Sequence, residues 1–119
     1  MLNANRLFRS FKCAGNGLCA LVKREQNFRI HLLVFLVVLS FSVYFEIKIW
    51  QWSLIILLAM FVLVLEIVNT AFERMIDILK PTWHEHAGAV KDLMSAAVLI
   101  VALASVAIGL LIFIPYIFP

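Results

Sequence analysis

Long apolar stretches separated by short polar segments make up most of the chain. They cover residues 30–47, 49–72 and 93–114, and the third contains no charged residue. A membrane-spanning helix needs about 20 mostly apolar residues, with about 17 as a lower limit. The pattern therefore predicts three transmembrane helices, of which the first is the shortest and is interrupted by His31.

The 29 residues before the first stretch are basic and polar, unlike a secretory signal peptide, which has an apolar core. Between Ala4 and Gln26 the apolar residues recur at helical spacing with basic residues opposite. This pattern predicts an amphipathic helix on the cytoplasmic membrane surface. Gly15 and Gly17 predict a bend or a break that would divide the segment into two helices.

A second interfacial segment is expected over residues 83–92, before the third stretch. Pro81 should end or interrupt the preceding helix, since proline lacks the backbone N–H. Thr82 is a plausible N-cap, and Glu85 follows it at the spacing of a capping box. The third membrane helix would then begin at Leu93.

Lysine and arginine are distributed unequally between the flanking segments. Six precede the first stretch, three lie between the second and the third, and Lys48 alone lies between the first and the second. Cytoplasmic loops of membrane proteins are enriched in these residues. We therefore expect the N-terminus and residues 74–92 in the cytoplasm and the C-terminus outside.

Composition excludes an ordinary soluble domain, because only 14% of the residues are charged where about a quarter is usual. The net charge of +3 is explained by the basic residues expected on the cytoplasmic side of a membrane protein and by attraction to anionic lipid. No motif for nucleic acid binding accompanies this charge. Cys13 and Cys19 are expected to be free thiols on the reducing side. Residues 1–119 are expected to form one domain, and three spans enclose so little interior that we infer an oligomer.

The most informative segment is residues 65–77, where polar residues enter an apolar run. They fall within about 80° of one another around a helix. A charge inside the membrane costs roughly 2.5–3.5 kcal/mol even on lenient scales, so this acidic stripe must face a protein interior or a wet cavity. A helix that simply emerges into water would explain its last residue better than its first. The stripe consists of Glu66, Asn69, Glu73 and Asp77.

Further polar residues should lie at the same membrane level. Several carboxylates with a lysine suit a magnesium–phosphate site, because magnesium prefers carboxylate and phosphate oxygens and lysine binds phosphate as a point charge. Glu66, which lies deeper, could accept a proton from a lipid hydroxyl. The residue types fit salt bridges between helices equally well, for example Lys91 with Asp77. The added residues are Glu25, Asn27, Lys91, Asp92 and Ser95.

The spacing of these residues resembles the signature of the small prokaryotic diacylglycerol kinase family, which includes undecaprenol kinases. Residues 10–18 and 25–31 also resemble the family's N-terminal region, so the resemblance covers about residues 6–115. The motif reads Glu66-x-x-Asn69-Thr70-Ala71-x-Glu73-x-x-x-Asp77, then His84, then Ala89-x-Lys91-Asp92-x-x-Ser95-Ala96-Ala97-Val98-Leu99.

The resemblance implies an all-α integral membrane fold, in which three-span protomers with a surface helix form a homotrimer. It also implies phosphorylation of a lipid alcohol, diacylglycerol or undecaprenol, with Mg²⁺ and ATP. The sites would be shared between protomers at the cytoplasmic face of the bacterial inner membrane. The compact N-terminus and the NFRIH stretch at residues 27–31 look more like the undecaprenol kinase branch.

Residue roles are implied by position in the family motif. Glu66 matches the proposed general base, Glu25 and Glu73 match the magnesium-binding glutamates, and Ser95 joins Glu66 at the lipid site. Cys13 and Trp83 stand where the family commonly has tyrosine, so an aromatic contact with the nucleotide is in question at position 13. The nucleotide site would comprise Arg6, Arg9, Asn69, Asp77, Thr82, Trp83, His84, Lys91 and Asp92.

The sequence thus indicates an ATP-dependent integral-membrane lipid kinase. Two alternatives stay open: a non-enzymatic three-helix subunit whose stripe pairs with a partner's basic residues, and a small proton or ion carrier that uses Glu66. A kinase requires Glu25, Glu73 and Lys91 together. A carrier requires Glu66 and has no use for a bound nucleotide.

Overall fold

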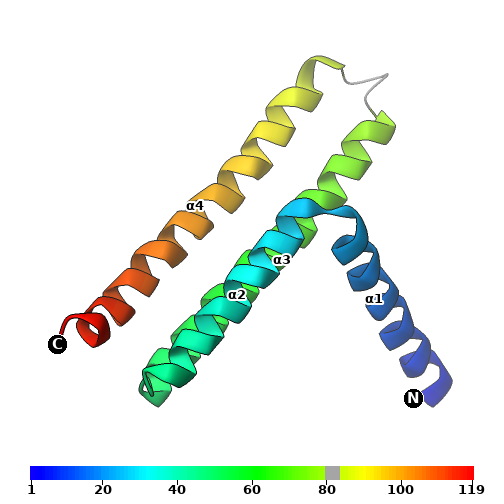
Figure 1. Ribbon diagram of the computed structural model, residues 1–119. Coiled ribbons are helices and arrows are strands. Elements are labelled where there is room, and N and C mark those ends of the chain that lie inside the picture. Colours follow the sequence, from blue (N-terminus) through cyan, green and yellow to red (C-terminus); the bar gives the residue numbers. More distant parts are fainter. Residues whose placement is uncertain (80–83) are drawn as a thin grey trace.

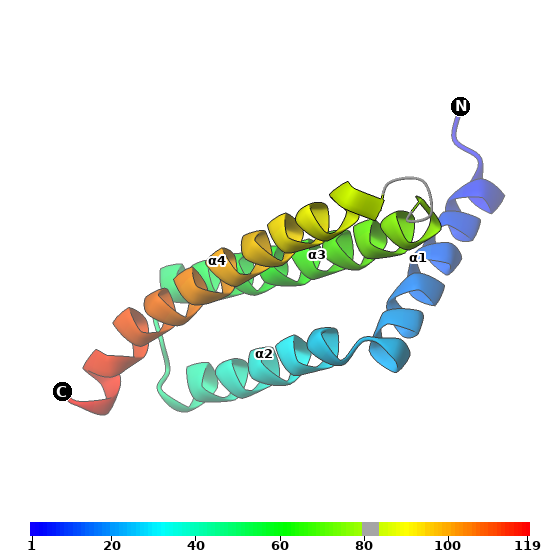
Figure 2. The same ribbon diagram turned by 90° about the horizontal axis from the view of Figure 1, so that it is seen from above.

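The computed structural model of the chain describes residues 1–79 and 84–119, which form helices joined by short connections. α2, α3 and α4 run lengthwise beside one another, and α1 diverges from them where it meets α2 (Figures 1 and 2). α4 packs most extensively on α3. The helices are α1 (Ala4–Arg24), α2 (Gln26–Tyr44), α3 (Ile49–Leu79) and α4 (His84–Ile117).

The last three helices are each long and apolar enough to cross a membrane, over Gln26–Tyr44, Ile49–Leu79 and His86–Ile117. They carry large apolar side chains on their outward faces, which suits contact with lipid or with another copy of the chain. The prediction of three apolar helices preceded by a further helix is therefore confirmed. The helices differ in extent from the predicted stretches: α2 begins earlier, at Gln26, and α3 continues to Leu79.

The predicted break at Gly15 or Gly17 is wrong. Both glycines lie inside α1, which is one helix, and neither has a positive φ. A glycine inside a helix costs only about 1 kcal/mol relative to alanine, which the rest of a long helix can offset. The chain bends instead at Glu25, whose extended backbone (φ −104°, ψ 112°) separates α1 from α2.

The expected separate interfacial segment over residues 83–92 is also wrong. From His84 onward this segment forms the first turns of α4 and continues into the third span without interruption. Gly88 is too weak a helix breaker to separate the two parts. Pro81, Thr82 and Trp83 lie outside the described residues, so the capping box stays a prediction.

The buried apolar cluster lies at the end of the bundle where α2 turns into α3. Gln51 ties this end together, because its Oε1 accepts from the hydroxyl of Tyr116 at 2.6 Å and from the backbone N–H of Lys48 at 3.0 Å. The last turns of α4 are thus held against the first turn of α3. The acidic stripe lies toward the other end of these two helices. The cluster consists of Ile47, Ile55 and Ile112.

Candidate active site

Helix length places the acidic stripe across one boundary of a hydrocarbon layer that begins at Ile49. At about 1.5 Å per residue, Glu66 lies about 26 Å from Ile49 and Asp77 about 42 Å from it. With Ile49 at one face of a hydrocarbon layer about 30 Å thick, Glu66 lies inside the layer near the opposite face, and Asp77 lies beyond it. Burial follows the same order, since Glu66 is 3% exposed and Asp77 is exposed.

Two buried polar atoms on α3, one in the stripe and one beside it, lack a partner within the described residues. The amide nitrogen of Asn69 donates to Oε1 of Glu73 at 3.4 Å, whereas Oδ1 of Asn69 and Oγ1 of Thr70 have no hydrogen bond. A buried unsatisfied polar atom costs about 1–3 kcal/mol, so both atoms are available to a ligand, water or a neighbouring chain. Sequence reasoning quoted Thr70 in the motif but assigned it no role at the site, although it lies one helical turn after Glu66 on the same face.

His31 of α2 lies opposite Glu66. Its Nε2 is 3.8 Å from Oε2 of Glu66, and the charges of Glu25 and Glu73 also act on this carboxylate. Sequence reasoning did not assign His31 to the site. The available signal was a titratable side chain inside the first apolar stretch, which is itself an indication of function in a membrane helix.

Glu25 reaches α3 from the junction of α1 and α2. Its Oε1 lies 3.6 Å from Nη2 of Arg74, and both side chains are partly exposed. Such exposed ion pairs are worth only about 0–1 kcal/mol. Glu25 could therefore exchange Arg74 for another cationic partner at little cost.

Lys91 of α4 contacts the same part of α3. Its Nζ lies 2.7 Å from Oδ1 of Asp77, which is the salt bridge expected on the purely structural interpretation of the polar residues. The charge of Glu73 also acts on Lys91, so the ammonium group lies at the level of the stripe. Asp92, the next residue, is exposed.

For the other predicted site residues, the structure gives no contact with the stripe among the described residues. Arg6 and Arg9 are exposed on α1, and among the described residues neither guanidinium makes an ion pair or a hydrogen bond. Ser95 is exposed on α4. Thr82 and Trp83 lie outside the described residues, and His84 is described only as the first residue of α4.

The donor types at the stripe fit a magnesium–phosphate group. Across residues 1–79 and 84–119, no three His, Cys, Asp or Glu side chains are grouped closely enough to hold a metal ion by themselves. Magnesium is commonly held by one or two carboxylates together with substrate phosphates. Glu25 and Glu73 would be two such carboxylates, and Oδ1 of Asn69, which has no hydrogen bond within the described residues, would be a further oxygen.

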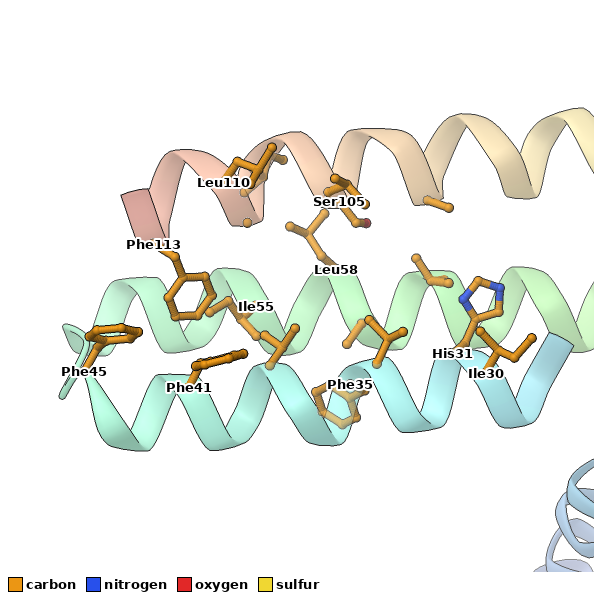
Figure 3. A pocket seen from close by; sticks show the side chains of 18 of the residues that line it. Ile30, His31, Phe35, Phe41, Phe45, Ile55, Leu58, Ser105, Leu110 and Phe113 are labelled. Carbon is orange, nitrogen blue, oxygen red and sulfur yellow. The ribbon is translucent and has the colours of Figure 1, made fainter. Parts of the chain in front are cut away.

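A cavity of about 530 Å³ lies between α2, α3 and α4. His31 and Ile30 stand at one end and Phe45 and Phe113 at the other (Figure 3). Among the described residues its lining is apolar except for His31 and Ser105, and the hydroxyl of Ser105 donates to the backbone oxygen of Val101 at 2.8 Å. A cavity of this kind suits a hydrocarbon chain whose polar end lies beside His31 and Glu66.

Comparison with known proteins adds sequence relatives to these observations. Residues 12–113 match the family model for prokaryotic diacylglycerol kinase. The chain is 39% identical to an undecaprenol kinase of Bacillus subtilis over 93% of this chain and 90% of that protein. It is 32% identical to a diacylglycerol kinase of Escherichia coli over 87% of this chain and 88% of that protein. A diacylglycerol kinase of Synechocystis is 31% identical over 89% of this chain and 61% of that protein.

Proposed function

This chain belongs to the prokaryotic diacylglycerol kinase family, and on that premise we propose how its residues carry out the reaction. It is a membrane lipid kinase of the diacylglycerol or undecaprenol kinase type. The non-enzymatic subunit and the ion carrier are not favoured. The observation that carries the mechanism is a buried carboxylate, Glu66, beside the polar end of an apolar cavity.

Glu66 acts as the general base. The lipid lies with its hydrocarbon chain in the cavity and its hydroxyl at the His31 end, next to Glu66. As the hydroxyl oxygen attacks the γ-phosphorus of ATP, its proton passes to Glu66, and ADP leaves with the electron pair of the broken P–O bond. No dedicated nucleotide fold is required, because positioning and electrostatics supply most of the rate in phosphoryl transfer.

The phosphates lie nearer the end of α3 than the reacting hydroxyl does. Glu25 and Glu73 would hold magnesium, which when bound offsets the negative charge of the phosphates. Lys91 adds a positive charge at the same level, and Asn69 offers its free amide oxygen. The other residues proposed at the nucleotide are Arg6, Arg9, Asp77, Thr82, Trp83, His84 and Asp92.

The active site is completed in a homotrimer. Arg6, Arg9 and Ser95 are exposed, and among the described residues Arg6 and Arg9 make no ion pair with the stripe. A neighbouring copy could bring these groups to the site, and it could cover the apolar outer faces of the spans. The unpartnered atoms of Asn69 and Thr70 could then find partners across the subunit boundary.

Undecaprenol is the preferred acceptor, with diacylglycerol as the second candidate. Ester carbonyls lie close to the hydroxyl in diacylglycerol, whereas the prenyl chain is pure hydrocarbon. Apart from His31, no side chain in the described part of the cavity lining has a free polar group, and an unpaired carbonyl buried there would cost about 1–3 kcal/mol. The 39% identity to an undecaprenol kinase supports the same preference.

Transfer of labelled phosphate from Mg-ATP to a panel of lipid alcohols in mixed micelles tests this function. We expect kcat/KM for undecaprenol to exceed that for diacylglycerol by about tenfold, which corresponds to about 1.4 kcal/mol. A higher kcat/KM for diacylglycerol than for undecaprenol would contradict the proposed substrate preference. A complete lack of transfer to every lipid alcohol would contradict the proposed activity.

The N-terminus and residues 74–92 lie in the cytoplasm, and the C-terminus lies outside. The contact of Arg74 with Glu25 brings the basic residues of α3 and of the α1–α2 junction to the same end of the bundle. Lys48 lies at the opposite end, in the turn between α2 and α3. The stripe would then meet ATP on the cytoplasmic side.

Cysteine labelling in sealed cells checks this orientation. A membrane-impermeant thiol reagent should label a Lys48→Cys variant from outside and leave Cys13 and Cys19 unlabelled. Both native thiols are exposed in the structure, so they should react once the membrane is permeabilised. Labelling of Cys13 or Cys19 in sealed cells would contradict the proposed orientation.

A further inference from the structure

The carboxylate of Glu66 has very few partners. Glu66 is 3% exposed, and within the described residues its carboxylate makes no hydrogen bond. His31 is the side chain that the structure places in ion-pair range, with Nε2 3.8 Å from Oε2. Glu25 and Glu73 act on Glu66 through their charges, and the α4 residues of the cavity lining carry no titratable group.

The depth of His31 is set by the junction of α1 and α2. Nη1 of Arg29 donates to the backbone oxygens of Val22 at 3.2 Å and Lys23 at 3.1 Å. Phe28, on the turn before His31, is 3% exposed. These contacts hold the first turn of α2 against the end of α1, and they carry the imidazole to the level of Glu66.

We propose that His31 is a positioning residue that orients the Glu66 carboxylate toward the lipid hydroxyl. The inference rests on the proposed role of Glu66 as the general base. A buried carboxylate without a hydrogen-bond partner can occupy several rotamers, and a donor on the facing helix restricts them. At 3.8 Å, a small rotation of either side chain or one bridging water completes the contact.

His31 also lies beside the space proposed for the lipid hydroxyl that accepts the phosphate. Its imidazole lines the cavity on the side where Glu66 lies, and the other polar lining residue, Ser105, already donates to Val101. His31 is therefore the one polar side chain in the described lining that makes no hydrogen bond within its own helix, and its imidazole lies close to both Glu66 and the space proposed for the lipid hydroxyl. Misplacing a reacting group by about 1 Å can lower a rate by about 10²-fold.

Steady-state kinetics of His31 variants test the positioning role. His31→Leu keeps the lining apolar, and we expect kcat to fall about 10- to 100-fold with KM for Mg-ATP unchanged. His31→Gln can still donate from a position near Nε2 and should recover part of this loss. The matched control is His86→Leu on α4, where His86 faces a small apolar pocket beside Phe72 and Ile76. This control should keep the parent kcat.

A double-mutant cycle with Glu66→Gln separates an effect through Glu66 from general structural damage. If His31 acts by orienting Glu66, His31→Leu should cause no further loss of kcat in the Glu66→Gln background. An equal fold-loss in both backgrounds would overturn the proposal, as would a His31→Leu variant that keeps more than half of the parent kcat.

Circular dichroism and elution in detergent check that each variant folds and assembles. Where His31→Leu does not assemble, His31→Asn repeats the same cycle, because its side chain remains polar but is too short to reach Glu66. Loss of kcat in the His31 variants with full kcat in Glu66→Gln would instead refute the proposed base, and with it the route through which His31 acts.

Discussion

Replacing Glu66 by glutamine should lower kcat by at least about 10²-fold, because general-base catalysis typically contributes about 10²–10⁴-fold. Glutamine keeps the size and hydrogen-bonding capacity of the side chain, but it cannot accept the proton of the lipid hydroxyl. The affinity for Mg-ATP should change little, since Glu66 lies deeper in the membrane than the groups proposed to hold the phosphates. Losing an interaction that is made only in the transition state lowers kcat without a matching rise in KM.

Single-turnover transfer of labelled phosphate, together with equilibrium binding of Mg-ATP, measures the two effects separately. Glu46→Gln provides a matched control, because Glu46 lies in the turn between α2 and α3 at the opposite end of the bundle. A Glu66→Gln variant that kept more than about a tenth of the parent kcat would exclude the general-base role. If the variant lost both activity and Mg-ATP binding, Glu66 would be assigned to the nucleotide site.

Replacing Glu25 or Glu73 by glutamine should raise the magnesium concentration needed for half-maximal activity by at least about tenfold. Even residues that only support metal ligands cost about 10- to 100-fold in affinity when mutated, and a neutral amide is a poorer ligand for magnesium than a carboxylate. Assembly of the proposed trimer should persist in both variants. Direct binding of Mn²⁺ with ATP, followed by electron paramagnetic resonance, should weaken in parallel.

Arg74→Gln distinguishes the metal role of Glu25 from its ion pair. Arg74 is the partner of Glu25 at 3.6 Å, so removing Arg74 would reproduce the effect of Glu25→Gln if Glu25 served only this pair. We expect Arg74→Gln to leave the magnesium requirement close to that of the parent. Unchanged magnesium dependence in both glutamate variants would assign Glu25 and Glu73 to structural salt bridges.

The number of long apolar helices and the polar face of α3 could be predicted because each depends on one segment at a time. The thickness of the hydrocarbon layer sets the length of an apolar stretch, and the helical period alone places Glu66, Asn69 and Glu73 on one face. The greater depth of Glu66 followed from the apolar residues on both sides of it. The structure agrees, since burial decreases from Glu66 to Asp77 along the stripe.

Local helix breaks were predicted less well, because their costs are small. Gly15 and Gly17 did not interrupt α1, and the expected interfacial segment became the first turns of α4. A single glycine costs only about 1 kcal/mol in a helix, which the surrounding helix can offset. The bend at Glu25 has no comparable signature in the residue types around it.

The sequence by itself determined the membrane spans, the family motif and the acidic stripe, since these follow from segment length, residue type and helical period. Only the tertiary structure decided which side chains meet across helices. The depth and rotation of α2 place His31 against Glu66, and the packing of α4 on α3 pairs Lys91 with Asp77. Helical periodicity specifies a face within one helix, but the facing residue depends on the register and rotation of its neighbour, which packing sets.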